Sequence, residues 1–395
     1  MKSFSLTMEV LFWSSFCLVV YTYFVYPAIL FVAYSLVQLR SDWLHLFGRK
    51  DRRVRPLSEG AVPNITLVVP AYNEEARLLE KLTNFGEMDY PREKMQIIFV
   101  SDGSTDLTNE MLKDSIGPNM EMIVLPKRSG KATALNHTVA RAENDILVFS
   151  DASTLFASDT LRKLVRHFVD PRVGAVCGAL QFHSSPESQR TEGIYWKYES
   201  MIRLMEARLG LTLTASGAVY ALRRNAYLSL HRSAVLDDFI IPMNARRAGY
   251  LVKYDPEATA TDYGAETVEG EFARRVRLAT GSFQSLMFFL GVELGIWGRF
   301  AFVSHKLLRW IVPPLLSVVL VSNIFLVRNP VYAVFASLQV TFYVWAGVGF
   351  YFRKRLKTVR FALLPYYLLA MNLAFLLGLF RSFMNHESIM WQRVE

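Results

Sequence analysis

Acidic and hydroxyl side chains follow three short apolar segments of the chain. They stand in Pro70-Ala-Tyr-Asn-Glu-Glu75, Ser101-Asp-Gly-Ser-Thr-Asp106 and Asp151-Ala-Ser-Thr154. Any one of these could be an ordinary turn, because Asp, Ser, Gly and Asn are common turn residues. Three in succession instead indicate a binding rim, where carboxylates could accept hydrogen bonds from a base or ribose, or hold a divalent cation that bridges phosphate oxygens.

A cationic segment, Arg128-Ser-Gly-Lys131, accompanies this rim. It could be a solvated basic turn, or Lys131 could neutralise bound phosphates. The chain lacks G-x-x-x-x-G-K-[ST] and has no G-x-G-x-x-G at its first apolar segment, the two glycine-rich patterns that cradle phosphates. Phosphates are therefore expected to be bound by a metal ion and by cations.

Alternating strands and helices are predicted to position these residues. Continuous apolar runs predict strands at 65–69, 96–100, 122–125 and 145–150. Amphipathic stretches predict helices at 75–85, from about residue 105, and at 132–142. This pattern is typical of an α/β domain with a mostly parallel sheet covered on both faces. Ligands bind such sheets beyond the carboxyl ends of the strands, where the acidic segments fall.

Long apolar segments flank this domain. Residues 10–39 predict a transmembrane helix, which Pro27 could kink, and 307–327, 331–352 and 361–380 are each long enough to cross a bilayer. Whether 361–380 crosses or lies in the interface stays open, and 281–300 predicts an interfacial helix. The chain is thus divided into 1–60 (membrane helix and basic linker), 61–281 (catalytic domain) and 282–395 (interfacial and membrane helices).

The basic residues point to a membrane rather than to nucleic acid. The formal charge of +9 concentrates beside the apolar segments, as expected on the cytoplasmic side of a bilayer. These residues are Arg40, Arg49, Lys50, Arg52, Arg53 and Arg55, and Arg353, Lys354, Arg355, Lys357 and Arg360. The expected location is the inner or plasma membrane, with the catalytic domain in the cytosol. Cys17 and Cys177 are interpreted as buried thiols.

The order of these motifs carries a family resemblance. Pro70-Ala-Tyr-Asn-Glu74, Asp102-Gly-Ser-Thr-Asp106, Gly130-Lys131 with Ala134-Leu-Asn136, and then Asp151 resemble the processive family-two glycosyltransferases, the synthases of cellulose, chitin, hyaluronan and poly-N-acetylglucosamine. The resemblance implies a GT-A-like nucleotide-sugar-binding domain. It also implies a donor-binding set that consists of Pro70, Tyr72, Glu74, Asp102, Lys131, Asp151, Arg274 and Arg277.

The resemblance implies a metal site with a substitution. Asp151 begins the D-x-D element that binds diphosphate and Mg²⁺ or Mn²⁺ in that family. The element here reads Asp151-Ala-Ser153, so a hydroxyl replaces the second carboxylate. A hydroxyl brings no charge to a metal. Asp151, with Ser153 or a neighbour such as Thr154, is expected to form the metal site.

Two further motifs match the catalytic and acceptor-binding parts of the family. Leu236-Asp-Asp238 could be a helix cap, but by resemblance Asp238 is the general base that takes the acceptor proton, with Asp237 in support. Thr214-Ala-Ser-Gly-Ala-Val-Tyr220 resembles the acceptor-binding stretch, which assigns Ser216 and Gly217 to the acceptor. Arg274-Arg-Val-Arg277-Leu278 resembles Q-x-x-R-W, with Arg in place of Gln and Leu in place of Trp. The aromatic-rich stretch at 192–199 is interpreted as core packing, and His305-Lys306 with Arg309-Trp310 as interfacial anchoring.

Three functions remain open at this point. The first is inverting, processive transfer from a UDP-sugar to a growing β-linked polysaccharide, with an accessory or export subunit among the expected partners. The second is transfer of a single sugar to a lipid-linked acceptor. The third is a catalytically silent synthase-like subunit, to which the replaced Asp and Trp would point.

Overall fold

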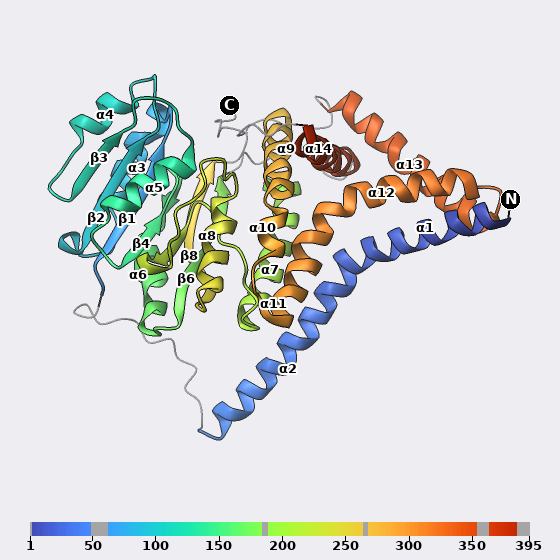
Figure 1. Ribbon diagram of the computed structural model, residues 1–395, viewed down its shortest axis with the longest axis horizontal. Helices are drawn as coiled ribbons and strands as arrows, with labels where there is room; N and C mark the ends of the chain where they lie inside the picture. Colours follow the sequence, from blue (N-terminus) through green and yellow to red (C-terminus); the bar gives the residue numbers. More distant parts are fainter. Residues whose placement is uncertain (1, 49–61, 184–188, 264–267, 354–362, 385–395) are drawn as a thin grey trace.

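The computed structural model describes residues 2–48, 62–183, 189–263, 268–353 and 363–384. Within them, eight strands form one sheet in the order β3-β2-β1-β4-β7-β6-β8-β5 (Figure 1). Their bounds are β1 Ile65–Ala71, β2 Met95–Ser101, β3 Met120–Val124, β4 Ile146–Phe149, β5 Leu155–Phe156, β6 Val173–His183, β7 Tyr220–Arg223 and β8 Leu251–Tyr263. The four predicted strands correspond to β1 to β4.

Parallel pairing dominates the half of the sheet that carries the acidic segments. β1 pairs in parallel with β2 on one side and with β4 on the other, and β2 pairs in parallel with β3. All residues of β1 are buried, as expected for a strand covered on both faces. β7 runs antiparallel between β4 and β6, while β6 and β8 are parallel. The predicted α/β class with a mostly parallel sheet is confirmed.

Helices cover both faces of the sheet, and each face has its own apolar core. On one face, α3 (Glu75–Gly86) and α6 (Thr160–Val165) contribute Leu78 and Leu161 to a core with Leu67. On the other, α5 (Lys131–Arg141) and α8 (Asp237–Arg247) contribute Leu135 and Ile241. The remaining short elements are α4 (Thr108–Asp114), η3 (Arg92–Lys94), η4 (Arg166–Val169) and η5 (Arg224–Ala226). Because α5 and α8 begin at the carboxyl edge of the sheet, their first turns face the candidate site.

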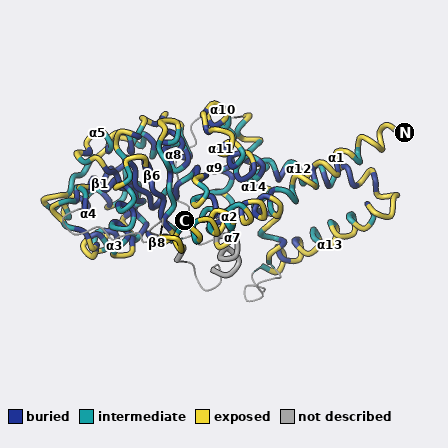
Figure 2. The backbone as a smooth tube through the Cα atoms, turned by 90° about the horizontal axis from the view of Figure 1, so that it is seen from below, coloured by how far each residue is buried: buried dark blue, intermediate teal, exposed yellow. Residues whose placement is uncertain are grey.

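Four helices are long and apolar enough to cross a membrane: Ser3–Leu46, Gly295–Leu326, Pro330–Phe352 and Leu364–Met384. The first comprises α1 (Lys2–Val20), η1 (Tyr21–Val25) and α2 (Tyr26–Leu46), and the second α11 (Gly295–Ala301), η6 (Phe302–Leu307) and α12 (Leu308–Leu326). The other two are α13 and α14. Figure 2 shows much of α1 and α13 exposed, in contrast to the buried strands. Large apolar side chains such as Leu36 and Leu338 are more than half exposed, as expected of surfaces that face lipid.

Two expectations about this part of the chain differ from the structure. The segment 281–300 is not one interfacial helix: α9 (Val268–Gln284) ends inside it, α10 (Leu286–Leu290) is short, and Gly295, with φ of 65°, begins the helix that continues to Leu326. Cys17 is exposed rather than buried, whereas Cys177 is buried. Pro27 is the second residue of α2, just after the π-helical η1 and within the helix Ser3–Leu46, so the kink expected there stays a prediction. The basic residues at 49–55 and 354–360 lie outside the described residues.

Buried charged side chains join the sheet domain to the first two apolar helices. Glu206, on α7 (Gln189–Arg208), accepts a hydrogen bond from the Tyr26 hydroxyl and pairs with Nδ1 of His305, both at 2.7 Å. Glu199, which precedes Glu206 on α7, pairs with Nε2 of His305 at 3.3 Å and with Arg309 at 2.5 Å. We call Tyr26, Glu199, Glu206, His305 and Arg309 the junction network. His305 is 1% exposed, so the interfacial anchoring predicted for it is wrong.

Candidate functional site at the carboxyl edge of the sheet

The loops after β1 and β2 are tied together by hydrogen bonds. Asn73 has a left-handed backbone with φ of 53°, and its Oδ1 accepts the backbone N–H of Thr105 at 2.9 Å. Across the same interface, Oε2 of Glu75 accepts the N–H of Leu107 at 2.9 Å. The residues predicted to hold a nucleoside therefore stand on a preformed rim, in which Pro70 lies in β1, Tyr72 is half-buried and Glu74 is buried.

Asp102 organises the neighbouring cationic loop. Its carboxylate accepts the backbone N–H groups of Ser129 at 2.7 Å and of Gly130 at 2.8 Å. Gly103, with φ of 68°, permits this approach, because a Cβ there would lie 2.5 Å from the backbone nitrogen of Arg128. The sequence predicted Asp102 as a nucleoside ligand. In the structure it is 1% exposed, and both of its oxygens fix the loop that leads into Lys131.

Lys131 lies between two carboxylates at the start of α5. Its ammonium nitrogen is 2.8 Å from Oδ1 of Asp151 and 3.2 Å from Oδ2 of Asp237. Burial lowers the pKa of Lys131, but the charges of Asp151, Asp237 and Asp238 outweigh this effect and raise it. We call Lys131, Asp151, Asp237 and Asp238 the Lys131 cluster. It brings together residues from the ends of three different elements, all of which the sequence analysis assigned to the candidate site.

Asp238 lies against the predicted acceptor-binding stretch. A Cβ at Gly217 would lie 3.6 Å from Oδ2 of Asp238, and the Asp238 carbonyl accepts the N–H of Ala215 at 2.9 Å. A hydrogen bond to β6 fixes the backbone of Ser216, because its N–H donates to Sγ of Cys177 at 3.0 Å. The N-cap of α8 is Leu236, with no side-chain capping bond, so capping does not account for the two aspartates. Ser216 and Gly217 therefore lie beside Asp238.

Burial dominates the electrostatics of the two aspartates. It raises the pKa of Asp237, with Lys131 opposing and Asp238 adding to the rise. It also raises the pKa of Asp238, against the charges of Lys131, Arg203 and Lys306. A carboxylate whose pKa is raised toward neutrality is a better proton acceptor than an exposed one. This environment suits general base chemistry at Asp238.

Arg274 and Arg277 approach the cluster from α9. Burial and the neighbouring Arg274 lower the pKa of Arg277, while Asp237 and Asp151 act to raise it. Arg274 forms a 3.8 Å ion pair with Glu271 on the same helix. The charges of Asp237 and Asp151 therefore act on Arg277. Arg274 lies three residues earlier on the same face of α9.

An acidic residue that the sequence analysis missed accompanies the D-x-S turn. Asp262, on β8, falls opposite the turn because β5 and β8 pair with Leu155 facing Thr261. Burial and the charge of Asp151 raise the pKa of Asp262, and a hydrogen bond from Ser153 opposes this rise. Within the described residues, no three acidic, His or Cys side chains gather to hold a metal ion. One or two carboxylates with substrate phosphates are a usual Mg²⁺ donor set, so Asp151 and Asp262 beside Ser153 fit a cation bound together with a diphosphate.

A second missed residue, Lys81, lies beneath the same turn. It is 0% exposed, its ammonium donates to Ser150 Oγ at 2.6 Å and to the carbonyl of Thr154, and it lies 4.9 Å from the ring centroid of Phe156. Burial lowers the pKa of Lys81 to about 7. A lysine on an amphipathic helix normally indicates a solvent-facing position, so its spacing in the sequence gave no signal. Lys81 holds both ends of the turn that carries Asp151 and Ser153.

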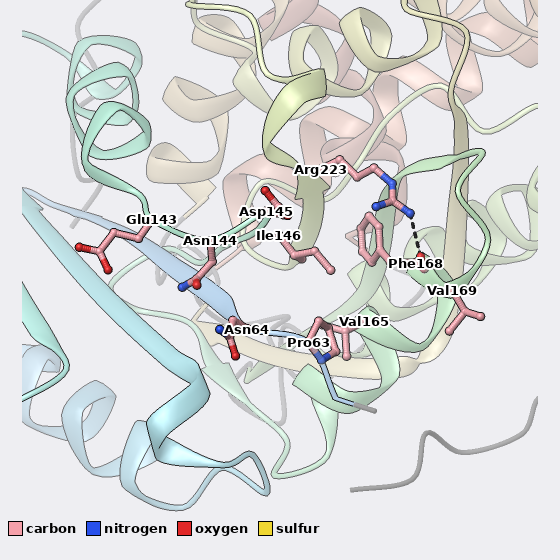
Figure 3. Close-up of a pocket in the computed structure, with 10 residues that line it drawn as sticks. All are labelled: Pro63, Asn64, Glu143, Asn144, Asp145, Ile146, Val165, Phe168, Val169 and Arg223. Carbon is pink, nitrogen blue, oxygen red and sulfur yellow. Dashed lines mark hydrogen bonds between the residues drawn. The ribbon is translucent and has the colours of Figure 1, made fainter. Parts of the chain in front are cut away.

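One cavity lies away from this edge. This cavity of about 520 Å³ lies at the opposite end of the strands, lined by Asn64, Asp145, Phe168 and Arg223 among others (Figure 3). Arg223 is satisfied there by the carbonyls of Val173 and Phe168. Ligands of parallel sheets bind at carboxyl ends, and the chemistry-bearing residues gather at that end, so the Lys131 cluster is the better candidate site.

Comparisons with known proteins agree with this fold. Residues 66–229 match the model of glycosyl transferase family 2. The mannosyltransferase PcManGT from Pyrobaculum calidifontis, solved in complex with GDP-Man and Mn²⁺, has a similar structure, with a TM-score of 0.69 at 21% identity over 98% of this chain and 99% of that one. At this identity the likeness concerns the fold, which is GT-A-like.

Curated relatives share part of their length with this chain. A poly-β-1,6-N-acetyl-D-glucosamine synthase of Staphylococcus aureus (strain COL) is 28% identical over 237 residues, which is 56% of this chain and 55% of the relative. An N-acetylglucosaminyltransferase of Rhizobium meliloti (strain 1021) is 25% identical over 62% of each chain. The chain thus spans little more than half the length of the curated relatives it matches. The resemblance inferred from the motifs is confirmed.

Proposed function

Because residues 66–229 form a glycosyl transferase family 2 domain, we propose that the chain is a membrane-embedded inverting glycosyltransferase that extends a β-linked polysaccharide from a UDP-sugar. The observation that carries the proposal is Lys131, 2.8 Å from Asp151 and 3.2 Å from Asp237, with Asp238 on the same helix turn. A diphosphate needs cations, and an attacking hydroxyl needs a base. The Lys131 cluster supplies both.

The donor would lie across the carboxyl ends of β1, β2 and β4. Tyr72, Glu74 and Asp102 would hold or frame the nucleoside, and Lys131 with Arg277 would neutralise the diphosphate. Arg274 would add charge from α9. A Mg²⁺ or Mn²⁺ ion, held by Asp151 with Ser153 and Asp262 nearby, would supply charge neutralisation for the same phosphates. UDP-N-acetylglucosamine and UDP-glucose are the first donors to test, and the GDP-Man complex of the mannosyltransferase makes GDP-mannose the third.

Asp238 would take the proton from the acceptor hydroxyl as that oxygen attacks the anomeric carbon. The bond from this carbon to the diphosphate oxygen breaks on the opposite face, so the configuration inverts. Gly217, whose missing side chain leaves the space beside Asp238 open, would let an acceptor approach closely. Asp237, the preceding residue of α8, would support the base.

The acceptor decides between two forms of this function. A growing glycan fits the polysaccharide synthases among the relatives. A lipid-linked acceptor that receives one sugar is the second candidate. Leu278, which replaces the family's Trp, packs among apolar residues near Phe239 and Trp310 and presents no aromatic ring to a sugar. An accessory or export subunit would be expected if the acceptor is a growing glycan. If the chain is instead a catalytically silent synthase-like subunit, no sugar transfer would be measured.

The four apolar helices would place the protein in the inner or plasma membrane with the catalytic domain in the cytosol. The division into 1–60, 61–281 and 282–395 stays part of the proposal. Its second boundary falls inside α9 (Val268–Gln284), which packs against α14. The catalytic domain and the membrane helices therefore share this helix.

The function is tested with the purified full chain in detergent. Nucleotide release and transfer of radiolabel are measured with UDP-N-acetylglucosamine, UDP-glucose and GDP-mannose, each with Mg²⁺ or Mn²⁺, in the presence of membrane lipids. A ladder of long products indicates a polysaccharide synthase, and a single glycolipid band indicates the second candidate. Absence of both turnover and nucleotide binding with every donor would contradict the enzyme.

The metal site has its own test. Asp151→Ala should raise the Mn²⁺ concentration needed for half-maximal nucleotide binding by about tenfold or more, since a carboxylate is the main charged ligand of such cations. Asp145→Ala is the matched control, because exposed Asp145 lies at the other end of the same strand. Equal Mn²⁺ titrations for the two variants in calorimetry would remove Asp151 from the metal site.

A further inference from the structure

Tyr220 places a buried hydroxyl without a hydrogen-bond partner next to the candidate site. The residue is 0% exposed, and its Oη has no partner among the described residues. Its ring stacks on that of Phe149 at 4.5 Å with an interplanar angle of 5°, because the two residues face each other across β4 and β7. Phe149 is followed closely by Asp151, so the stack lies at the carboxyl edge of the sheet.

A second tyrosine on the same stack behaves differently. The Tyr227 ring lies 6.3 Å from that of Phe149, and its hydroxyl donates to Oδ1 of Asn136 at 2.7 Å. One phenol of the stack is therefore satisfied and the other is not. A buried polar atom that forms no hydrogen bond costs stability, and a phenylalanine would avoid this cost. The Tyr220 hydroxyl needs an explanation that packing does not give.

The Lys131 cluster contains the matching acceptor. Oδ2 of Asp237 is also buried without a hydrogen bond among the described residues, and its ion pair with Lys131 is the longer of the two that Lys131 forms. Burial and the charge of Asp237, followed by those of Tyr227, Asp238 and Asp151, raise the pKa of Tyr220. Its hydroxyl therefore keeps its proton and can act as a donor.

We propose that Tyr220 is a positioning residue that donates its hydroxyl hydrogen to Asp237 when a nucleoside diphosphate draws Lys131 away. This rests on the proposed function, because it takes the ligand to be a nucleoside diphosphate. Without the ligand, Lys131 neutralises Asp237. With the ligand, the ammonium turns to the diphosphate, and Asp237 would remain as a buried carboxylate without a partner. A hydrogen bond from a phenol to a carboxylate is charge-assisted and stronger than a neutral one, so it replaces the lost partner.

Calorimetry with UDP and GDP, each with Mn²⁺, tests this on the full chain in detergent. Tyr220→Phe should weaken binding of the nucleotide that the wild type binds by about tenfold, the range for a hydrogen bond to a charged group, and leave the Tm of the free protein unchanged or higher. Tyr227→Phe is the control, since it loses a satisfied bond and should lower Tm without changing nucleotide affinity. A wild type that binds neither nucleotide would overturn the proposed function, and the role of Tyr220 with it. Equal affinities of wild type and Tyr220→Phe would overturn the role of Tyr220 alone.

A double-variant cycle separates positioning from packing. In Lys131→Met, Asp237 has lost Lys131 in the free protein, so Tyr220 should already bond to it there. Adding Tyr220→Phe should then lower the Tm of the free protein, whereas the same change in the wild-type background should not. If Tyr220→Phe shifts Tm equally in both backgrounds, the hydroxyl does not respond to Lys131 and the proposal fails. If Lys131→Met does not fold, the comparison of nucleotide affinities for Tyr220→Phe and Tyr227→Phe decides.

Discussion

Two buried clusters of charge in this molecule differ in how many cations surround their carboxylates. In the junction network, Glu199 is surrounded by His305, Arg309 and, at 3.7 Å, Lys306. In the Lys131 cluster, one ammonium serves two carboxylates, and Oδ2 of Asp237 accepts no hydrogen bond among the described residues. The Glu199 carboxylate is thus matched by several cations, whereas Asp237 shares a single ammonium with Asp151.

The pKa values of the carboxyl groups in the two clusters differ in the same way, and this separates carboxylates that stabilise the fold from carboxylates that are available for chemistry. Burial raises the pKa of Glu199, but the charges of His305, Lys306 and Arg309 outweigh it and hold the pKa of this carboxyl well below its usual range. Burial raises the pKa of Asp237 and Asp238, and here it dominates. A carboxylate that is fully compensated holds elements together. One that is undercompensated is ready to take a proton or a ligand.

The sharpest way to break this comparison is Asp238→Asn. It should reduce sugar transfer by about 10²–10⁴-fold, the usual contribution of a general base, while nucleotide affinity and Tm stay close to those of the wild type. Initial rates with the active donor, together with calorimetry, measure both effects. Asp255→Asn is the control, because Asp255 is buried and bonded to Arg166 and His167, so it should lower Tm instead. Loss of nucleotide binding in Asp238→Asn would move Asp238 to the donor side.

Local sequence assigned Asp102, Lys131 and Asp151 to the carboxyl edge of the predicted sheet, whereas Asp237 was assigned by resemblance. Asp102 follows β2 and Asp151 follows β4, and parallel strands bring such positions to one edge. The strands and the helices around them followed from apolar periodicity, because their burial pattern is set within a few residues. Asp238 was assigned by resemblance, and its place beside Gly217 supports that role without testing it.

Residues whose partners are distant in the chain could not be predicted in this way. Asp262 reaches the D-x-S turn only through the pairing of β5 with β8, and Lys81 is buried because Ser150 and Thr154 accept its hydrogens. His305 resembled a membrane anchor, since its two glutamate partners lie about a hundred residues earlier on α7. The predicted interfacial helix at 281–300 ignored Gly295, whose positive φ starts a new helix.

Glu199→Gln tests the junction network, the cluster in which more cations surround a carboxylate. It leaves Arg309 and Lys306 without their carboxylate, and breaking a buried ion pair by removing one partner costs about 3–5 kcal/mol. Thermal unfolding in detergent should show this loss, with turnover per folded molecule largely preserved. Glu257→Gln is the control, because its pair with Arg166 is 62% exposed on the Glu side and such pairs contribute about 0–1 kcal/mol. Similar losses for the two variants would mean that the junction network is not a stabilising device.

The smallest effect concerns Lys81, whose pKa burial lowers to about 7 from 10.5. Between these two values the unfolded chain binds this proton more tightly than the folded chain. Stability should therefore rise with pH across this window, by at most about 1.4 kcal/mol per pH unit. Lys81→Met cannot titrate and lacks this rise, so the wild type should gain on the variant between pH 7 and pH 10 when free energies of unfolding are compared.

Lys113→Met shows what the loss of an exposed lysine does in the same pH series. If the difference between wild type and Lys81→Met stays constant across the window, Lys81 remains protonated and belongs with the fully compensated charges of the junction network. If the difference grows with pH, nearby carboxylates do not fully offset the burial of the Lys81 charge, just as Lys131 does not fully offset the burial of Asp237. The turn that carries Asp151 would then rest on a cation whose charge is lost close to neutral pH.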